Sequence, residues 1–290
     1  DMPRGAADAP LVEIGMGTLD QNKAVLIAYG HNLAAGAEAM IYTEENNLWN
    51  NVDIGGVCCT AIDLTRITET GRASKIPANL GPKVKVAGAM GWWRKMIRAD
   101  IMDAVMVDEQ CIYCDVLEDC EKRHVPVIAS NDKIMLGLPD RTNDPADAIV
   151  EDLVSFKAPG AAILDPVKAG EVAIRVAIAV KPKRAQFKKD ITFNEQQFKE
   201  TLEKCTACNQ CAFVCPPHIK ISNMIAEALK GNLEPFSSTY EVCVGCQRCE
   251  QACPQEIPVL KLYEYANREY IKNQKFKMRA GRGPVLDTEI

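Results

Sequence analysis

The thirteen cysteines of this 290-residue chain are unevenly distributed, and two copies of one pattern lie near its C-terminal end. Each copy reads C-x2-C-x2-C-x3-C-P. The copies are Cys205, Cys208, Cys211 and Cys215 followed by Pro216, and Cys243, Cys246, Cys249 and Cys253 followed by Pro254. Thiolates at this spacing are ligands of iron–sulfur clusters, so the chain is predicted to carry electrons.

The spacing is the one that holds [4Fe-4S] clusters in bacterial ferredoxins, where the fourth cysteine of each run binds the other cluster. We therefore assign one cluster to Cys205, Cys208, Cys211 and Cys253. The second cluster is assigned to Cys243, Cys246, Cys249 and Cys215. Two zinc sites would need the same number of ligands, but a closely spaced triplet with a distant fourth cysteine is a poor zinc pattern.

The composition is that of a soluble globular protein, with 47% hydrophobic and 25% charged residues. A net charge of −5 disfavours nucleic acid or an anionic membrane surface as a partner. No apolar run approaches the roughly 20 residues of a membrane helix. Because no export signal is visible and the cysteines cluster at metal-ligand spacing, we expect a reducing cytoplasm rather than disulfides. The ends of the sequence suggest a segment of a longer polypeptide.

The first two thirds of the chain alternate short β-rich runs with helix-like stretches. The expected strands are residues 24–28, 51–54, 84–87, 104–107, 125–129 and 161–164. The expected helices are residues 33–42, 61–69, 92–98, 116–123, 146–156 and 171–180. This alternation predicts an α/β fold with a Rossmann-like parallel sheet.

The chain is predicted to divide into four parts. Residues 1–20 are expected to be an irregular lead-in, and residues 21–185 the Rossmann-like domain. Pro182 and the basic residues 181–189 are typical of a linker. Residues 190–270 are expected to form an α-helical, ferredoxin-type domain with two [4Fe-4S] clusters, and residues 271–290 to begin a further segment. Residues 257–277 are predicted to continue as an amphipathic helix.

Soft metal ligands follow three of the predicted strands. His31 follows strand 24–28, Cys58 and Cys59 follow strand 51–54, and Cys111 follows strand 104–107. Ligands bind beyond the carboxyl ends of parallel strands, so these side chains could converge on one metal site. Alternatively, the histidine is an ordinary loop residue and the cysteines act as small hydrophobic residues.

Two further cysteines lie close to this candidate site in the sequence. Cys114 and Cys120 are predicted to lie on the helix that follows Cys111, and we expect them to be structural. Cys111 and Cys114 could also form half of a zinc site, although no matching pair lies nearby in the sequence.

At these residues the chain resembles the nickel–iron carbon monoxide dehydrogenases, and in particular the archaeal α-subunit family of the acetyl-CoA decarbonylase/synthase complexes. The motifs that carry the resemblance are Gly30-His31-Asn32, Gly56-Val57-Cys58-Cys59-Thr60-Ala61, Val107-Asp108-Glu109-Gln110-Cys111 and Arg141-Thr142-Asn143-Asp144-Pro145. The double cysteine run after the α/β domain adds to it. The resemblance covers nearly the whole chain.

The resemblance implies a [NiFe4S4] cluster, the C-cluster, with His31, Cys59 and Cys111 among its ligands and Cys58 beside them. The other three cysteine ligands, the acid/base residues and further [4Fe-4S] clusters would lie outside this segment. The implied reaction interconverts CO and CO2 and passes electrons to ferredoxin. The implied partners are a small ε subunit in an α2ε2 assembly and the acetyl-CoA synthase and corrinoid subunits, in a methanogenic or methanotrophic archaeon.

Two other functions remain open from the sequence. The chain could be an electron-transfer subunit without its own catalytic site, which would hold iron and sulfide but no nickel. It could also be a non-nickel enzyme of the hybrid-cluster type. The placement of His31, Cys59 and Cys111 at three strand ends argues against the first, and the helical cluster domain argues against the second.

Overall fold

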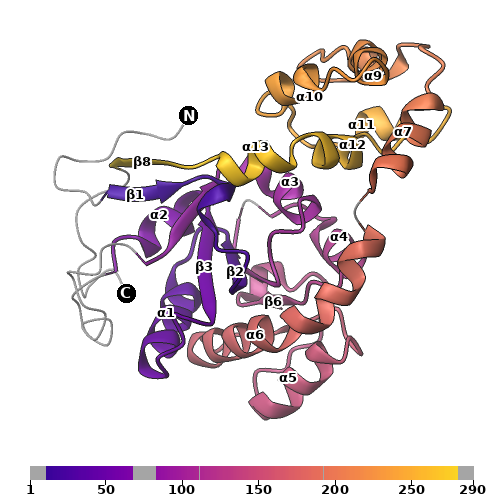
Figure 1. Ribbon diagram of the computed structural model, residues 1–290. Coiled ribbons are helices and arrows are strands. Elements are labelled where there is room, and N and C mark those ends of the chain that lie inside the picture. The colour runs from indigo at the N-terminus through magenta and orange to yellow at the C-terminus, as the bar shows by residue number, and fades with distance from the viewer. Residues whose placement is uncertain (1–10, 68–82, 111, 192, 280–290) are drawn as a thin grey trace.

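The described residues form a single, mostly parallel sheet with helices packed around it. The computed structural model describes residues 11–67, 83–110, 112–191 and 193–279, and its elements are labelled in Figure 1. The eight strands run in the order β7-β6-β5-β2-β3-β4-β1-β8. Their bounds are β1 Leu11–Ile14, β2 Ala24–Tyr29, β3 Val52–Val57, β4 Lys85–Gly88, β5 Ala104–Val107, β6 Val127–Ala129, β7 Gly160–Ala162 and β8 Phe276–Arg279.

The six strands predicted from the sequence are all present, and all of them pair in parallel. Strand β2 lies between β3 and β5, with Leu26 opposite both Ile54 and Ala104. All six residues of β2 are buried, which explains its continuous apolar sequence. The α/β prediction is therefore confirmed for the central sheet.

Helices alternate with these strands along the chain. In the α/β part the helices are α1 Ala34–Glu45, α2 Cys58–Leu64, η4 Met90–Trp92, α3 Trp93–Arg98, α4 Val116–Glu121, η5 Asp132–Ile134, α5 Ala146–Val154 and α6 Pro166–Ile191, with η1 Met16–Thr18 before β2. Each of the six expected helices overlaps one of these, and residues 68–69 of the second lie outside the described residues.

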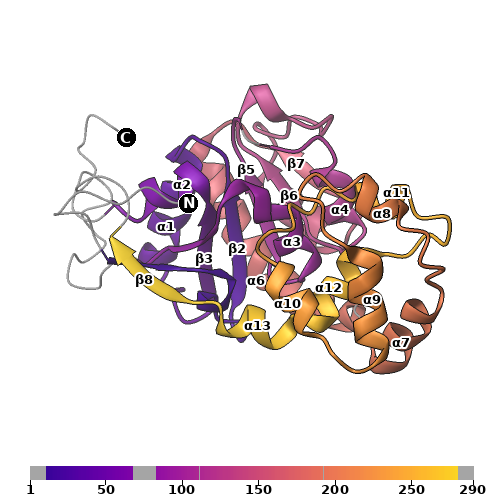
Figure 2. The same cartoon turned by 90° about the horizontal axis from the view of Figure 1, so that it is seen from above.

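A smaller helical part follows α6. It consists of α7 Glu195–Glu203, α8 Gln210–Phe213, α9 Ile221–Leu229, α10 Glu234–Thr239, α11 Arg248–Gln251, α12 Val259–Ala266 and α13 Arg268–Asn273. Helix α7 begins with a capping box, in which the Asn194 side chain accepts from the Gln197 N–H and the Gln197 side chain accepts from the Asn194 N–H. The two views in Figures 1 and 2 place this part to one side of the sheet.

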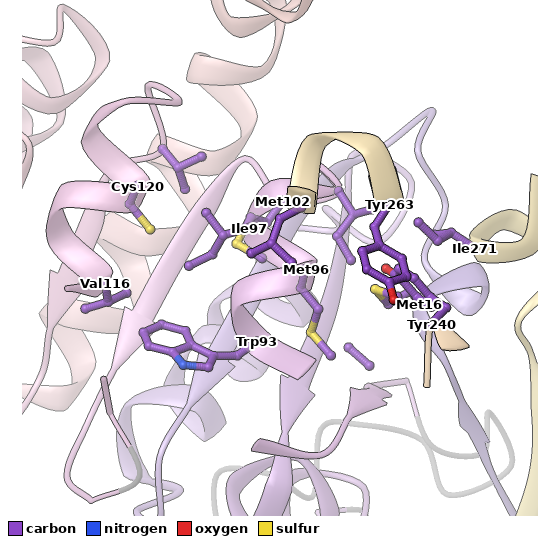
Figure 3. Packing of buried hydrophobic residues seen from close by; sticks show 14 of the residues in the cluster. Met16, Trp93, Met96, Ile97, Met102, Val116, Cys120, Tyr240, Tyr263 and Ile271 are labelled. Atoms are coloured by element: carbon purple, nitrogen blue, oxygen red, sulfur yellow. The ribbon is translucent and has the colours of Figure 1, made fainter. Parts of the chain in front are cut away.

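The two faces of the sheet are covered by different helices. One core joins Leu26, Met106 and Ile128 to residues of α1, α5 and α6. The other core, shown in part in Figure 3, joins the opposite face of the strands to Trp93 and Met96 of α3 and to buried residues of the helical part. The helical part is thus packed onto one layer of the α/β part.

The predicted linker is wrong, because residues 181–189 lie within α6. Pro182 is inside the helix, where a proline costs about 3 kcal/mol. Long-range contacts oppose this cost. The Arg184 guanidinium, 1% exposed, is paired with Asp100 and, at 2.8 Å, with Asp103, and Lys181 Nζ donates to the Gln21 carbonyl at 2.8 Å.

The expectations for residues 11–14 and 257–279 also need correction. Residues 11–14, expected in an irregular lead-in, form β1, whose Val12 and Ile14 are buried. The helix expected over residues 257–277 divides into α12 and α13. It then gives way to β8, which pairs antiparallel with β1 and so completes the sheet rather than beginning a separate segment. In the part of the chain that the structure describes, no helix has the length and apolar character of a membrane span.

Candidate metal centres

The first group of candidate ligands lies at the carboxyl edge of the sheet, where Asp108 accepts hydrogen bonds from the surrounding segments. This carboxylate follows β5 and is 5% exposed. Its Oδ1 accepts the His31 backbone N–H at 2.7 Å and also that of Glu109, and its Oδ2 accepts from Thr60 Oγ1 at 3.0 Å. One buried carboxylate therefore connects the loops that follow β2 and β5 with the first turn of α2.

Burial raises the pKa of Asp108, and the backbone N–H groups of His31, Glu109 and Asn32 partly offset this. Gly30 makes the close approach possible. Its φ is 132°, and a Cβ at this position would lie 1.7 Å from Asp108 Oδ1. Asp108 belongs to one of the sequence motifs, but no role was predicted for it. The signal in the sequence is an acidic residue directly after a central strand.

His31 and Cys59 lie at this edge with exposed side chains. Cys58 and Cys59 open α2, and Cys58 has a left-handed backbone with φ 58°. The Thr60 N–H donates to the Gly30 carbonyl at 3.4 Å, so the two loops are in contact. Cys111, the third expected ligand, lies outside the described residues.

Cys114 and Cys120 differ in their surroundings. Cys120 lies in α4 and is fully buried, and burial raises the pKa of its thiol. Cys114 precedes α4 rather than lying on it, and it is exposed. The expectation that both would lie on the helix is therefore correct for Cys120 and wrong for Cys114.

The second group of candidate ligands lines one pocket in the helical part. Cys215, Cys243, Cys246 and Cys249 all contribute to it, and Ile219, Ile221, Leu260 and Tyr263 are among the other residues of its wall. Burial raises the pKa of Cys243, whereas the Gly245 N–H and the Lys95 ammonium lower it. The structure thus brings together the fourth cysteine of the first run and three cysteines of the second.

The two cysteine runs have the same backbone conformation at matching positions. Left-handed residues recur at Ala207 and Gly245, at Asn209 and Gln247, and at His218 and Glu256. Asn209 and Gln247 precede the short helices α8 and α11. Such left-handed turns aim backbone N–H groups into a concavity that suits iron–sulfur clusters.

The first run is the more exposed of the two. Cys208 is exposed, Cys205 and Cys211 are half-buried, and the nearby Phe213 side chain is 89% exposed. Burial raises the pKa of Cys211, and Cys205 and Cys208 lie near enough to raise it further. Cys253 is half-buried after α11.

The chemistry of both groups is that of soft metal ligands. Among the described residues, no three His, Cys, Asp or Glu side chains are gathered closely enough to hold a single metal ion. The four thiols of the second group instead line the wall of a pocket. Two of these sulfurs accept backbone N–H groups, Cys215 Sγ from Ile219 and Cys243 Sγ from Gly245, each at 3.4 Å. Thiolates in such an apolar pocket fit an iron–sulfur cluster, and the imidazole and thiol at the sheet edge fit nickel or iron.

With the fold and the two groups of candidate ligands described, the chain can be compared with known proteins. The model of the Prismane/CO dehydrogenase family matches residues 5–236. The chain belongs to this family.

Relatives match the whole chain. The chain is 88% identical over 290 residues to the acetyl-CoA decarbonylase/synthase complex subunit alpha of Methanothrix soehngenii. The match covers 100% of this chain and 37% of that protein. The chain is 43% identical over 290 residues to subunit alpha 1 of Methanosarcina thermophila, covering 100% of this chain and 35% of that protein. The chain therefore spans about a third of the length of these relatives.

A solved carbon monoxide dehydrogenase from Thermococcus sp. AM4 is also similar. The TM-score is 0.44 at 18% identity, covering 68% of this chain and 30% of that chain.

Proposed function

We propose that this chain is part of the α subunit of an acetyl-CoA decarbonylase/synthase complex and takes part in the reaction CO + H2O ⇌ CO2 + 2H+ + 2e−. The observation that carries the proposal is the carboxyl edge of the sheet, where Asp108 links the segments bearing His31 and Cys59. The 88% identity to a subunit of that name supports it.

In this proposal His31, Cys59 and Cys111 are three ligands of a nickel–iron–sulfur cluster. When bound, the cluster supplies Lewis-acidic metal sites for CO and water and accepts the two electrons. Asp108 holds the His31 backbone and the start of α2 in place through its hydrogen bonds. The side chains of His31 and Cys59 are exposed. A cluster bound to them would therefore be open to the further cysteine ligands that are proposed to lie elsewhere in the full-length protein.

The cysteine runs would hold two [4Fe-4S] clusters. Cys205, Cys208, Cys211 and Cys253 are proposed for one, and Cys243, Cys246, Cys249 and Cys215 for the other. The shared pocket of the second set supports that half of the assignment. Electrons would leave towards ferredoxin, and the exposure of Cys208 and Phe213 favours the first run as the site of exit.

The test uses the full-length protein, expressed and loaded with metal under anaerobic conditions. Cys59→Ser is expected to lose bound nickel and CO oxidation with a viologen dye, while the electron paramagnetic resonance signals of the [4Fe-4S] clusters remain. Cys114→Ser is the matched control, because Cys114 is also an exposed thiol near this edge but is not a proposed ligand.

The same experiment separates the rival function. Full nickel content and activity in Cys59→Ser would refute the assignment of this edge. Iron and sulfide without nickel in the wild-type protein would identify an electron-transfer subunit that has no catalytic site of its own.

A further inference from the structure

Helix α3 carries a buried lysine next to the second group of cysteines. The side chain of Lys95 is 3% exposed. Its Nζ donates to the Tyr240 carbonyl at 2.5 Å and lies 4.3 Å from the centroid of the Trp92 ring and 4.5 Å from that of Tyr240. A carbonyl and two ring faces solvate the ammonium, but none of these groups carries a negative charge.

The other two cations of α3 do have carboxylate partners. Arg94 pairs with Asp115 at 2.5 Å, and Arg98 pairs with Asp119 at 3.0 Å. Among the described residues, no carboxylate lies within ion-pair distance of Lys95 Nζ, whose printed hydrogen bond goes to a backbone carbonyl instead. Buried charges in proteins are normally paired, so a counter-charge is expected beside Lys95.

The thiols of the second group are in the right place to supply that charge. The Lys95 side chain comes within 3.5 Å of the Cβ position at Gly245, in the turn between Cys243 and Cys246. Burial lowers the pKa of Lys95 to about 8, and Cys243 opposes this more strongly than Glu241 does. A cluster held by four thiolates carries net negative charge, and the charge increases when the cluster is reduced.

We propose that Lys95 is the counter-charge of the cluster held by Cys215, Cys243, Cys246 and Cys249 and that it raises the reduction potential of this cluster. The inference rests on the proposed function, because it requires that the cluster exists. A buried cation stabilises the reduced state more than the oxidised state, since the reduced state is more negative. Lys95 is thereby a tuning residue that the α/β part contributes to the helical part.

The first run has different surroundings, although its backbone matches. The turn of the second run lies against α3, where Gly245 approaches both Arg94 and Lys95. In the first run, Cys208 is exposed to solvent, and so is Lys204, which directly precedes Cys205. A charge at Lys204 is screened by water and salt, whereas the buried charge of Lys95 is screened much less. The two clusters should therefore differ in potential despite their identical cysteine spacing.

The test is an anaerobic redox titration of the full-length, cluster-loaded protein, followed by electron paramagnetic resonance. Lys95→Met is expected to shift one of the [4Fe-4S] midpoints to a more negative potential and to leave the others in place. At a fixed potential the reduced-to-oxidised ratio of that cluster should fall at least tenfold, which is 59 mV for one electron. Lys95→Arg should restore the midpoint, and the other clusters serve as internal references.

Lys204→Met is the matched control, because it removes the same side chain from an exposed position beside Cys205. It should leave all of the [4Fe-4S] midpoints unchanged. Lys95→Met protein with its [4Fe-4S] signals at full intensity and unshifted midpoints would overturn the inference and leave the proposed function intact. The absence of [4Fe-4S] signals from loaded wild-type protein would overturn both.

Loss of the Tyr240 hydrogen bond could prevent cluster assembly in Lys95→Met. Lys95→Gln removes the charge but keeps an N–H donor for that carbonyl, so it carries the same prediction. A more negative midpoint in Lys95→Gln supports the inference, and an unchanged midpoint refutes it.

Discussion

Substitution of the buried Asp108 tests whether its hydrogen bonds hold together the segments that carry His31 and Cys59. Asp108→Ala removes the acceptor for the His31 and Glu109 N–H groups and for the Thr60 hydroxyl. A buried donor left without a partner costs about 1–3 kcal/mol. Because water can reach the exposed His31 loop and replace part of the lost hydrogen bonding, we expect a total loss of about 3 kcal/mol for the three donors. Asp108→Asn keeps one oxygen acceptor and should cost about 1 kcal/mol.

Hydrogen exchange measured by mass spectrometry under anaerobic conditions tests this locally. A loss of about 3 kcal/mol corresponds to about a hundredfold faster opening, because each 1.4 kcal/mol is a factor of ten. The effect should be confined to peptides containing residues 30–32, 58–61 and 108–110.

Asp53→Asn is the control for this experiment. Asp53 is also a buried sheet aspartate whose pKa is raised by burial, but its Oδ2 accepts from the Asp20 N–H at 2.9 Å, away from the candidate site. Asp53→Asn should therefore leave the three loops unchanged. Exchange in the Asp108→Ala loops that stays within threefold of wild type would refute the role given to this carboxylate.

Three further predictions concern the stability of the fold. Arg184→Met removes the guanidinium that pairs with the buried Asp100 and Asp103, of which Asp103 keeps Lys181 at 3.5 Å. It should destabilise the protein by about 3 kcal/mol, seen as a lower anaerobic Tm. Burial raises the pKa of Glu264 to about 7 in the folded protein, above the unfolded value of 4.5. The free energy of unfolding should therefore fall by about 3 kcal/mol as the pH rises from 4.5 through 7. Urea titrations should show this fall in the wild-type protein and not in Glu264→Gln. Gly30→Ala should lower the Tm, because the added Cβ would collide with the Asp108 carboxylate. Gly137→Ala is the control and should lower the Tm less, because Gly137 also has a positive φ but no atom within 4 Å of the added Cβ.

The central sheet could be predicted because its strands are short apolar runs buried on both faces. Ala104–Val107, for example, was predicted with the bounds that the structure gives. Strands β1 and β8, which lie side by side at one end of the sheet, could not be predicted in this way, because they pair across more than 260 residues of sequence. Their pairing depends on tertiary contacts that no local pattern records.

Pro182 shows the opposite failure, in which a strong local signal was misleading. The proline predicted a break, but the helix continues past it, and the buried ion pairs of Arg184 attach this part of α6 to the segment before β5.

Part of the candidate site followed from topology. The sequence placed His31 and Cys59 at the ends of parallel strands, and the structure has both at that edge. The roles inferred for Asp108 and Lys95 could not be predicted, because they depend on burial and on partners from distant segments. The ligand roles of His31, Cys59 and Cys111 stay predictions.

The most direct test of the account is anomalous scattering from anaerobic crystals of the full-length protein, recorded on both sides of the nickel edge. The proposed function predicts a nickel peak beside an iron cluster contacted by His31, Cys59 and Cys111, with two further iron clusters at the cysteine runs. Iron at the cysteine runs with neither nickel nor iron beside His31 would contradict it.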